Sequence, residues 1–146
     1  MPLYFAYGSN MDINQLRQRC PKSKFINIGK LIGYRLEFTH YSSGWEGGVA
    51  DVVPDSEKEV WGIVYQLSKS DLVRLDSYEG YPDIYTRFKT GIETPFGRKS
   101  NVWVYRVVYK GTYEPTRAYL DIIKRAALTY QFPANYIAYL NRIKTI

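Results

Sequence analysis

The segment around Glu79 places a carboxylate where an ordinary surface helix would carry a positive charge. The pattern predicts a short helix that ends at Gly80, with Pro82 just beyond it, so Glu79 lies at the helix C-terminus. A carboxylate is unfavourable beside the negative end of the helix dipole. Desolvation by neighbouring tyrosines would raise its pKa towards the range of a general acid or base. Those tyrosines are Tyr78, Tyr81 and Tyr85. Taken alone, the pattern also fits an exposed glutamate near a helix end.

A second segment, Tyr7-Gly8-Ser9-Asn10, joins a β-prone stretch to the start of a predicted helix. Gly8 lets the backbone approach a ligand closely, since it has no side chain. The amides that follow, near a helix N-terminus, can bind a carboxylate or an oxyanion. A plain turn between a strand and a helix would have the same four residues, so this interpretation stays open on the motif alone.

The rare residue types exclude several other chemistries. Cys20 is the only cysteine and His40 the only histidine, so no internal disulfide, multi-cysteine metal site or His-based zinc site is expected. Gly8-Ser9-Asn10 lacks the second glycine of a nucleophile elbow, and the stretch from Gly44 to Gly48 lacks the Gly-Lys-Ser/Thr of a P-loop. We expect Cys20 to be buried and His40 to be a surface or satisfied core histidine. An enzyme built from this chain would use carboxylates, hydroxyls and backbone amides.

Hydrophobic patterning predicts one α+β domain over residues 1–146, with a mainly antiparallel or mixed curved sheet. A β-prone stretch covers residues 3–7, and one strand or two cover 25–41, broken near Gly29 or Gly33. Short strands are expected over 48–53 and 60–65, separated by a polar turn over 55–59. The 60–65 strand is nearly all apolar, so we expect it to be central. A hairpin with its turn over 94–99 joins strands at 85–93 and 100–109.

Caps and periodicity predict the helices. Asp12 begins one that Pro21 ends, and Ser68 begins a second through an S-x-x-D capping box with Asp71. Thr116 and Pro133 begin two C-terminal helices. The apolar stripes of this C-terminal pair are expected to pack in the core rather than hold a cofactor. In the second helix, the residues expected to face inward are Leu72 and Leu75, with Tyr78 as a further candidate.

Composition and charge fit an ordinary globular domain. The 146 residues are 45% hydrophobic and 23% charged, with 20 Lys and Arg against 14 Asp and Glu, a net charge of +6. The positive residues are scattered, and no nucleic-acid-binding signature occurs, so a solvated surface is expected and no nucleic-acid partner. No stretch of eighteen apolar residues and no signal-peptide pattern is present, so no membrane association is expected. The single cysteine suits a reducing compartment, which predicts a cytoplasmic location.

Four segments, in this order, resemble the γ-glutamylcyclotransferase family (AIG2-like). They are Tyr4 to Asn10, Glu59 to Tyr65, Leu75 to Gly80, and a C-terminal run of Pro115 to Tyr119 followed by Phe132 to Ile137. The resemblance covers nearly the whole chain. An ordered set of four motifs is far more specific than any one of them, so it favours the functional interpretation of the Gly8 and Glu79 segments.

The resemblance implies a small barrel-like curved sheet, mixed or antiparallel, flanked by short helices and a C-terminal helix pair. It also implies an enzyme that cleaves γ-glutamyl amides by cyclisation and releases 5-oxoproline with a free amine or amino acid. Glu79 would be the general acid/base. The implied substrate-binding residues are Tyr7, Gly8, Ser9, Asn10 and Tyr119, with Tyr85 and Tyr105 near the same pocket. No metal or cofactor is implied; the partner would be a small anionic γ-glutamyl substrate, and relatives allow a homodimer.

The identity of the amide is left open by the sequence. γ-Glutamyl amino acids are the first expectation, and γ-glutamylamines such as γ-glutamyl-lysine are the alternative. Glutathione is less expected, because another branch of the family specialises in it. A non-catalytic binding module of the same fold is a third alternative, against which the presence of Glu79 argues. The loop from His40 to Gly48 is expected to line the leaving-group side of the pocket.

Overall fold

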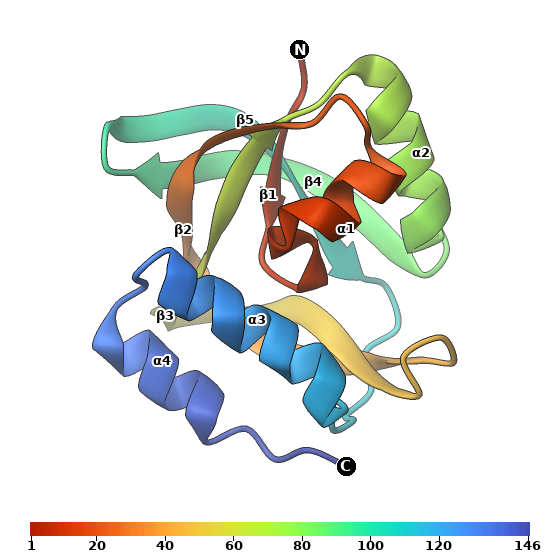
Figure 1. The fold of residues 1–146 in the computed structure, drawn as a ribbon, viewed down its shortest axis with the longest axis vertical. Coiled ribbons are helices and arrows are strands. Elements are labelled where there is room, and N and C mark those ends of the chain that lie inside the picture. Colours follow the sequence, from red (N-terminus) through yellow and green to blue (C-terminus); the bar gives the residue numbers. More distant parts are fainter.

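A closed five-stranded barrel forms the centre of the molecule in a computed structural model that describes all residues, 1–146. The strands follow one another around the barrel in the order β1-β3-β2-β4-β5 (Figure 1). Neighbouring strands pair antiparallel, except for β1 and β5, whose parallel pairing closes the barrel. The strands are β1 (Leu3–Ala6), β2 (Lys24–Ser42), β3 (Gly47–Gln66), β4 (Tyr85–Thr94) and β5 (Gly97–Val107). The expected α+β class with a curved, barrel-like sheet is confirmed.

Helices lie around this barrel in two groups. A short 3₁₀ helix, η1 (Ser9–Met11), follows β1 and leads into α1 (Ile13–Arg19), which lies beside α2 (Lys69–Glu79) (Figure 1). The second group is the predicted C-terminal pair, α3 (Arg117–Thr129) and α4 (Ala134–Asn141), which pack against each other. Since η1 contacts both α1 and α3, the short turn after β1 lies where the two groups meet.

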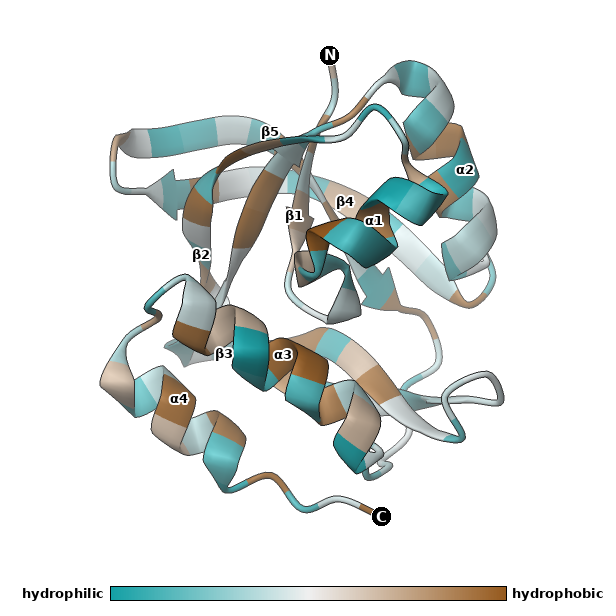
Figure 2. Ribbon diagram, viewed as in Figure 1, coloured by the Kyte–Doolittle hydropathy of each residue, from teal (hydrophilic) through white to brown (hydrophobic).

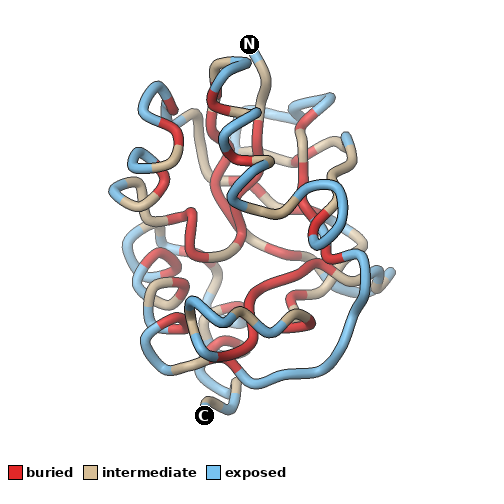
Figure 3. Tube along the Cα trace, turned by 90° about the vertical axis from the view of Figure 1, so that its right-hand side faces the viewer, coloured by how far each residue is buried: buried red, intermediate tan, exposed pale blue.

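The core fills the barrel and the space beneath α3. The 60–65 segment of β3 pairs with β1 on one side and β2 on the other, as its apolar sequence predicts. Hydrophobic residues follow β3 and alternate with hydrophilic ones along α3 in Figure 2, and buried residues follow the barrel strands in Figure 3. The stripes of the C-terminal pair are buried at Tyr119, Ile123, Tyr136 and Leu140, so they belong to the core as expected.

The sequence predicts two strands separated by a polar turn over residues 55–59, and this prediction is wrong, because β3 runs without a break through these residues. β2 and β3 form one long hairpin, in which Tyr34 pairs with Pro54 and the next pair is Ile32 with Glu59. The residues between Pro54 and Glu59 therefore face Gly33 alone and bulge from the ladder. Gly33 has φ +88°, in the left-handed region that favours glycine. The β2 pairs on either side of it, at Pro54 and Glu59, keep this polar segment within one continuous strand, which its own sequence does not favour.

The predicted helix caps are confirmed in detail. The side chains of Asp12, Ser68 and Thr116 each accept a hydrogen bond of 3.0 to 3.2 Å from a backbone amide in the first turn of the following helix. Gly80 ends α2 in the left-handed conformation, with φ 68°. No helix is long and apolar enough to cross a membrane.

One half of the predicted capping box differs from the expectation. The Asp71 side chain accepts a hydrogen bond of 2.8 Å from the amide of Lys22 instead of turning back to Ser68. Asp71 is buried and its carbonyl accepts a contact from the Cys20 thiol at 3.4 Å. Asp71 thus joins α2 to the loop that follows α1, and Cys20 is buried there as predicted.

Candidate active site

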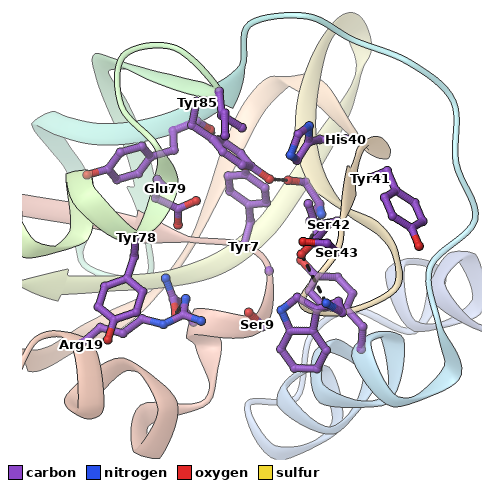
Figure 4. A pocket seen from close by; sticks show the side chains of 18 of the residues that line it. Tyr7, Ser9, Arg19, His40, Tyr41, Ser42, Ser43, Tyr78, Glu79 and Tyr85 are labelled. Carbon is purple, nitrogen blue, oxygen red and sulfur yellow. Dashed lines mark hydrogen bonds between the residues drawn. The ribbon is translucent and has the colours of Figure 1, made fainter.

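A cavity of about 340 Å³ opens between the η1 turn, the end of α2 and the loop that joins β2 to β3 (Figure 4). All eight site residues expected from the sequence line this one cavity. They are Tyr7, Gly8, Ser9, Asn10, Glu79, Tyr85, Tyr105 and Tyr119. Their roles in binding or chemistry stay predictions, but the tertiary structure brings together segments that are far apart in the sequence.

Glu79 is placed by the way α2 begins and ends. The Ser68 cap and the buried Leu75 hold the helix in position, and Gly80 turns the chain away directly after Glu79. The Glu79 side chain points into the cavity towards Tyr7 (Figure 4). It forms no ion pair. The carboxylate therefore faces the space that a ligand would fill.

The environment of Glu79 changes its acidity. Burial of the carboxyl group raises the pKa of Glu79 from 4.5 to about 7. The nearby guanidinium of Arg19 opposes this rise, and the negative charge of Asp76 adds to it. Near neutral pH the carboxyl group therefore populates both protonation states, which a proton-transfer group requires.

The turn at Gly8 is packed tightly between α3 and β3. A Cβ atom at position 8 would lie 3.1 Å from the Tyr119 hydroxyl and 3.2 Å from the Ala50 Cβ. In η1, the backbone amides of Met11 and Asp12 donate hydrogen bonds to the carbonyls of Gly8 and Ser9. The amides of Gly8, Ser9 and Asn10 are not donors in these two hydrogen bonds. These amides are the ones that the sequence predicts to bind an anionic group.

The side chains of the turn are fixed by α1 and are themselves buried. The side-chain nitrogen of Gln15, Nε2, donates to the Ser9 hydroxyl at 2.7 Å and to the Asn10 side-chain oxygen at 3.0 Å, and both Ser9 and Asn10 are buried. The Asn10 side-chain nitrogen donates to the hydroxyl of Tyr4 at 3.0 Å, and Arg19 donates to the Asn10 oxygen at 3.0 Å. Every polar atom of the Asn10 side chain is thus engaged, which holds the turn in a single geometry.

Three tyrosines of the site hold the barrel wall through backbone groups. The Tyr85 hydroxyl donates to the Ala50 carbonyl at 2.7 Å, and the Tyr119 hydroxyl accepts from the Ala50 amide at 3.0 Å. The Tyr7 hydroxyl donates to the Tyr105 carbonyl at 2.7 Å. Burial raises the pKa of these three tyrosines and that of Tyr105, so all four hydroxyls stay neutral at ordinary pH.

Asp76, one helical turn before Glu79, is fully paired. Arg87 donates to its two oxygens at 2.8 and 3.1 Å, and the Tyr105 hydroxyl donates at 2.6 Å. The Arg87 guanidinium also lies over the ring of Trp103, 4.1 Å from its centre. Of the two carboxylates at this end of α2, only Glu79 lines the cavity without a cationic partner.

The wall opposite α2 comes from the end of β2 and the loop that follows it. Its cavity residues are His40, Tyr41 and Ser42 of β2 and Ser43 and Trp45 of the loop, so residues of the segment from His40 to Gly48 line the pocket as expected. The Trp45 ring packs edge-on against the Tyr119 ring, and the two ring centres are 5.0 Å apart. His40 is half-buried and lies edge-on to Tyr85 at 6.3 Å. The sequence predicts a surface or core histidine, and the structure places His40 on the wall of the cavity.

Two features of the rim were missed or misjudged from sequence. Tyr78 is 62% exposed rather than turned inward, and its ring lies 4.9 Å from the Arg19 guanidinium. Arg19 lines the cavity, although no sequence motif marks it as a site residue. The available signal was its position on the helix, next to the buried face marked by Leu16 and Cys20.

The chain resembles known proteins in sequence and in fold. Residues 4–125 match the family described as "Gamma-glutamyl cyclotransferase, AIG2-like". The proteins named gamma-glutamylcyclotransferase from Bos taurus and Homo sapiens are each 30% identical over 147 residues, which cover 97% of this chain and 78% of theirs. A solved structure titled "Gamma-glutamyl cyclotransferase" has a TM-score of 0.92 at 29% identity and covers 99% of this chain and 89% of that one.

Proposed function

The chain belongs to the gamma-glutamyl cyclotransferase, AIG2-like family, and we propose that it cleaves γ-glutamyl amides to 5-oxoproline and a free amine. The observation that carries this proposal is the position of Glu79 across one cavity from the turn at Gly8, within walls formed by buried tyrosines. The residues that line the cavity match the tasks of this reaction one by one.

The nucleophile of the reaction is supplied by the substrate itself. The α-amino nitrogen attacks the γ-carbonyl carbon, a five-membered ring forms, and the bond from that carbon to the amide nitrogen breaks. Holding the γ-glutamyl chain bent makes the attack intramolecular, with effective molarities up to about 10⁵ M or more in favourable cases. A chain with one buried cysteine and one histidine suits this chemistry, because no protein nucleophile is required.

Proton transfer is the task of Glu79 in this mechanism. The α-amine enters as an ammonium ion and gives a proton to the Glu79 carboxylate, and the leaving nitrogen then takes a proton back. A pKa of about 7 lets one carboxyl group serve in both directions near neutral pH. General acid/base catalysis of this kind contributes roughly 10²- to 10⁴-fold in rate.

Charge that develops on the γ-carbonyl oxygen needs hydrogen-bond donors. The amides of Gly8, Ser9 and Asn10 form a rigid turn beside the cavity, and we assign them to the γ-glutamyl group and its oxyanion. The neutral hydroxyls of Tyr119 and Tyr85 belong to residues that line the same cavity, and both are hydrogen-bonded to the backbone of Ala50 in β3. The reaction as written uses no metal and no cofactor.

The favoured substrates are γ-glutamyl amino acids, after the relatives named gamma-glutamylcyclotransferase. We assign the leaving group to the wall formed by His40 to Trp45, which lies across the cavity from Arg19 and Tyr78 (Figure 4). γ-Glutamylamines remain the alternative class. A cytoplasmic location and a homodimer are kept as further expectations, as is the absence of nucleic-acid and membrane partners.

A substrate panel tests the proposal. Purified protein is incubated with γ-glutamyl-alanine, γ-glutamyl-lysine and glutathione, and 5-oxoproline is measured by chromatography. We expect the fastest release from γ-glutamyl-alanine; a faster release from γ-glutamyl-lysine would select the alternative class. Absence of 5-oxoproline from every amide would refute the enzymatic proposal and favour a binding module.

Glu79→Gln tests the catalytic assignment. This variant should lose about 10²- to 10⁴-fold in turnover while it keeps the circular dichroism spectrum of the parent. Glu57→Gln, on an exposed part of β3, is the matched control and should keep full activity. Undiminished turnover in Glu79→Gln would remove Glu79 from its role.

A further inference from the structure

Arg19 is the one Lys or Arg side chain that lines the cavity. It lies at the last position of α1 and takes part in none of the six ion pairs of the structure. A guanidinium without an acidic partner, on the wall of a cavity, is available to bind an anion. Its planar set of donors matches a carboxylate in particular.

The position of the Arg19 side chain is determined on two sides. One of its terminal nitrogens donates to the Asn10 side-chain oxygen at 3.0 Å, and the guanidinium lies over the Tyr78 ring, 4.9 Å from its centre. Asn10 in turn is held by Tyr4 and Gln15. A guanidinium has five N–H donors, and the structure engages one nitrogen, so several donors remain for a ligand.

Glu79 and Arg19 lie on the same side of the cavity without forming an ion pair (Figure 4). The two groups still influence each other, because Arg19 opposes the rise in the pKa of Glu79. A ligand that carries both an ammonium and a carboxylate on one carbon would satisfy both groups at once. The α-carbon of a γ-glutamyl group carries this pair of charges.

We propose that Arg19 binds the α-carboxylate of the γ-glutamyl group and thereby positions the α-amine beside Glu79. This inference rests on the proposed function, since it concerns the substrate of that reaction. It makes Arg19 a specificity residue: amides of 4-aminobutyrate, which lack the α-carboxylate but could cyclise in the same way, would be poor substrates. A γ-glutamyl amino acid has a second carboxylate, on the leaving amino acid. We assign that one to the wall from His40 to Trp45 and not to Arg19.

Three substrates separate these assignments. γ-Glutamyl-alanine has both carboxylates, γ-glutamyl-methylamide lacks the one on the leaving group, and 4-aminobutyryl-alanine lacks the α-carboxylate. Each is assayed with the parent protein, Arg19→Gln and Arg19→Lys. The matched control is Arg17→Gln, which makes the same change in charge at an exposed position of the same helix. Rates are compared at pH 8.5, where Glu79 is ionised in the parent.

We expect Arg19→Gln to lower kcat/KM by roughly 10- to 100-fold for both γ-glutamyl substrates, the usual value of a charged hydrogen-bonded contact. The effect on 4-aminobutyryl-alanine should be less than about 2-fold, and Arg19→Lys should recover part of the loss. Arg17→Gln should match the parent. An equal loss on 4-aminobutyryl-alanine would overturn the inference by showing a structural role. A loss that disappears with γ-glutamyl-methylamide would overturn it in favour of the leaving-group carboxylate.

Binding of the product gives a readout that does not depend on turnover. By calorimetry, 5-oxoproline should bind the parent at least 10-fold more tightly than Arg19→Gln, whereas 2-pyrrolidinone, which lacks the carboxylate, should not distinguish them. If the parent cleaves no γ-glutamyl amide, the proposed function fails. Loss of 5-oxoproline binding in Arg19→Gln would even then support the carboxylate site. Equal 5-oxoproline binding by both proteins would overturn it.

Discussion

The Tyr105 hydroxyl donates a hydrogen bond of 2.6 Å to Oδ1 of Asp76, one turn before Glu79 on α2. Together with Arg87, this bond satisfies the Asp76 carboxylate, while Glu79 faces the cavity and forms no ion pair. Two carboxylates three residues apart thus have different environments, one paired and one desolvated. Such separation is how a fold assigns a structural role to one carboxylate and proton transfer to its neighbour.

The pH dependence of activity follows from this difference. Glu79 must start as a carboxylate to accept the proton of the substrate ammonium, so kcat/KM should rise with pH with an apparent pKa near 7. Asp76→Asn removes the negative charge that raises the pKa of Glu79, so the rise should move to lower pH. The measurement is kcat/KM for γ-glutamyl-alanine between pH 5 and 9. A rise centred near 4.5 in the parent would contradict the assignment.

Glu79→Gln should be more stable than the parent at high pH. The folded-state pKa of Glu79 lies above its ordinary value, so ionisation destabilises the folded protein as pH rises from 4.5 through about 7. The gain from Glu79→Gln should be near zero at pH 4 and grow to at most about 3 kcal/mol at pH 8. Urea unfolding of both proteins at the two pH values measures it. A gain that does not depend on pH would show that Glu79 is not desolvated.

Gly8→Ala should damage the site through crowding rather than backbone strain. Gly8 has φ −112°, which other residues adopt readily, but the added methyl group would lie 3.1 Å from the Tyr119 hydroxyl. We expect a loss of stability of about 1 to 3 kcal/mol and a lower kcat/KM, because the turn and Tyr119 must move apart. Gly44→Ala is the control for stability, since its nearest neighbour, the Ser42 hydroxyl, is 3.7 Å away. An equal change in stability in the two variants would argue against a tightly packed turn.

Tyr119→Phe should cost stability and activity together. Removal of the hydroxyl leaves the buried Ala50 amide without its acceptor, which costs about 1 to 3 kcal/mol. The same change loosens the wall beside the Gly8 turn, so kcat/KM should fall as well. Tyr109→Phe, at a site 85% exposed, should change neither quantity. Thermal unfolding and the 5-oxoproline assay measure both effects, and an unchanged melting temperature in Tyr119→Phe would contradict the prediction.

An ion pair between the buried Asp51 and the partly exposed Lys110 anchors the chain between β5 and α3. Asp51 is fully buried and accepts hydrogen bonds from the Val107 amide at 2.9 Å, the Thr39 hydroxyl at 2.7 Å and the Lys110 ammonium at 2.6 Å. Lys110→Met should destabilise the protein by about 2 to 4 kcal/mol, because it leaves a buried charge without its cation. Asp51→Asn in the same chain should recover part of that loss. Lys58→Met, at an exposed position, is the control, and denaturant unfolding is the measurement.

Much of the local structure could be predicted because its causes lie within one or two turns of the chain. The cap at Ser68 and the left-handed Gly80 determine where α2 begins and ends, and hence that Glu79 is its last residue. The apolar run from Val60 to Tyr65 predicts a central strand, and the β3 pairing confirms it. The family resemblance added the barrel and the expectation that the Gly8 turn and Glu79 share one site.

Other features depend on partners distant in the sequence, and local patterns missed them. The polar residues after Pro54 look like a turn, yet they bulge within one continuous strand that is paired to β2 on either side, at Pro54 and Glu59. Asp71 looks like half of a capping box, yet its carboxylate accepts a hydrogen bond from the Lys22 amide. Arg19 looks like a solvated helix-end cation, yet Asn10 holds it at the cavity wall.

The sequence alone determined which residue types the chemistry has to use, where each α-helix begins and where α1 and α2 end, since these follow from composition and from short-range effects of caps, glycine and proline. The tertiary structure decided which of those residues meet. Closure of the barrel places the Gly8 turn opposite Glu79, 71 positions later in the chain, and brings Tyr119 against both the turn and β3. It also decided their acidity and charge balance, because desolvation of Glu79 and the lack of an acidic partner for Arg19 arise only when separate elements pack around one cavity.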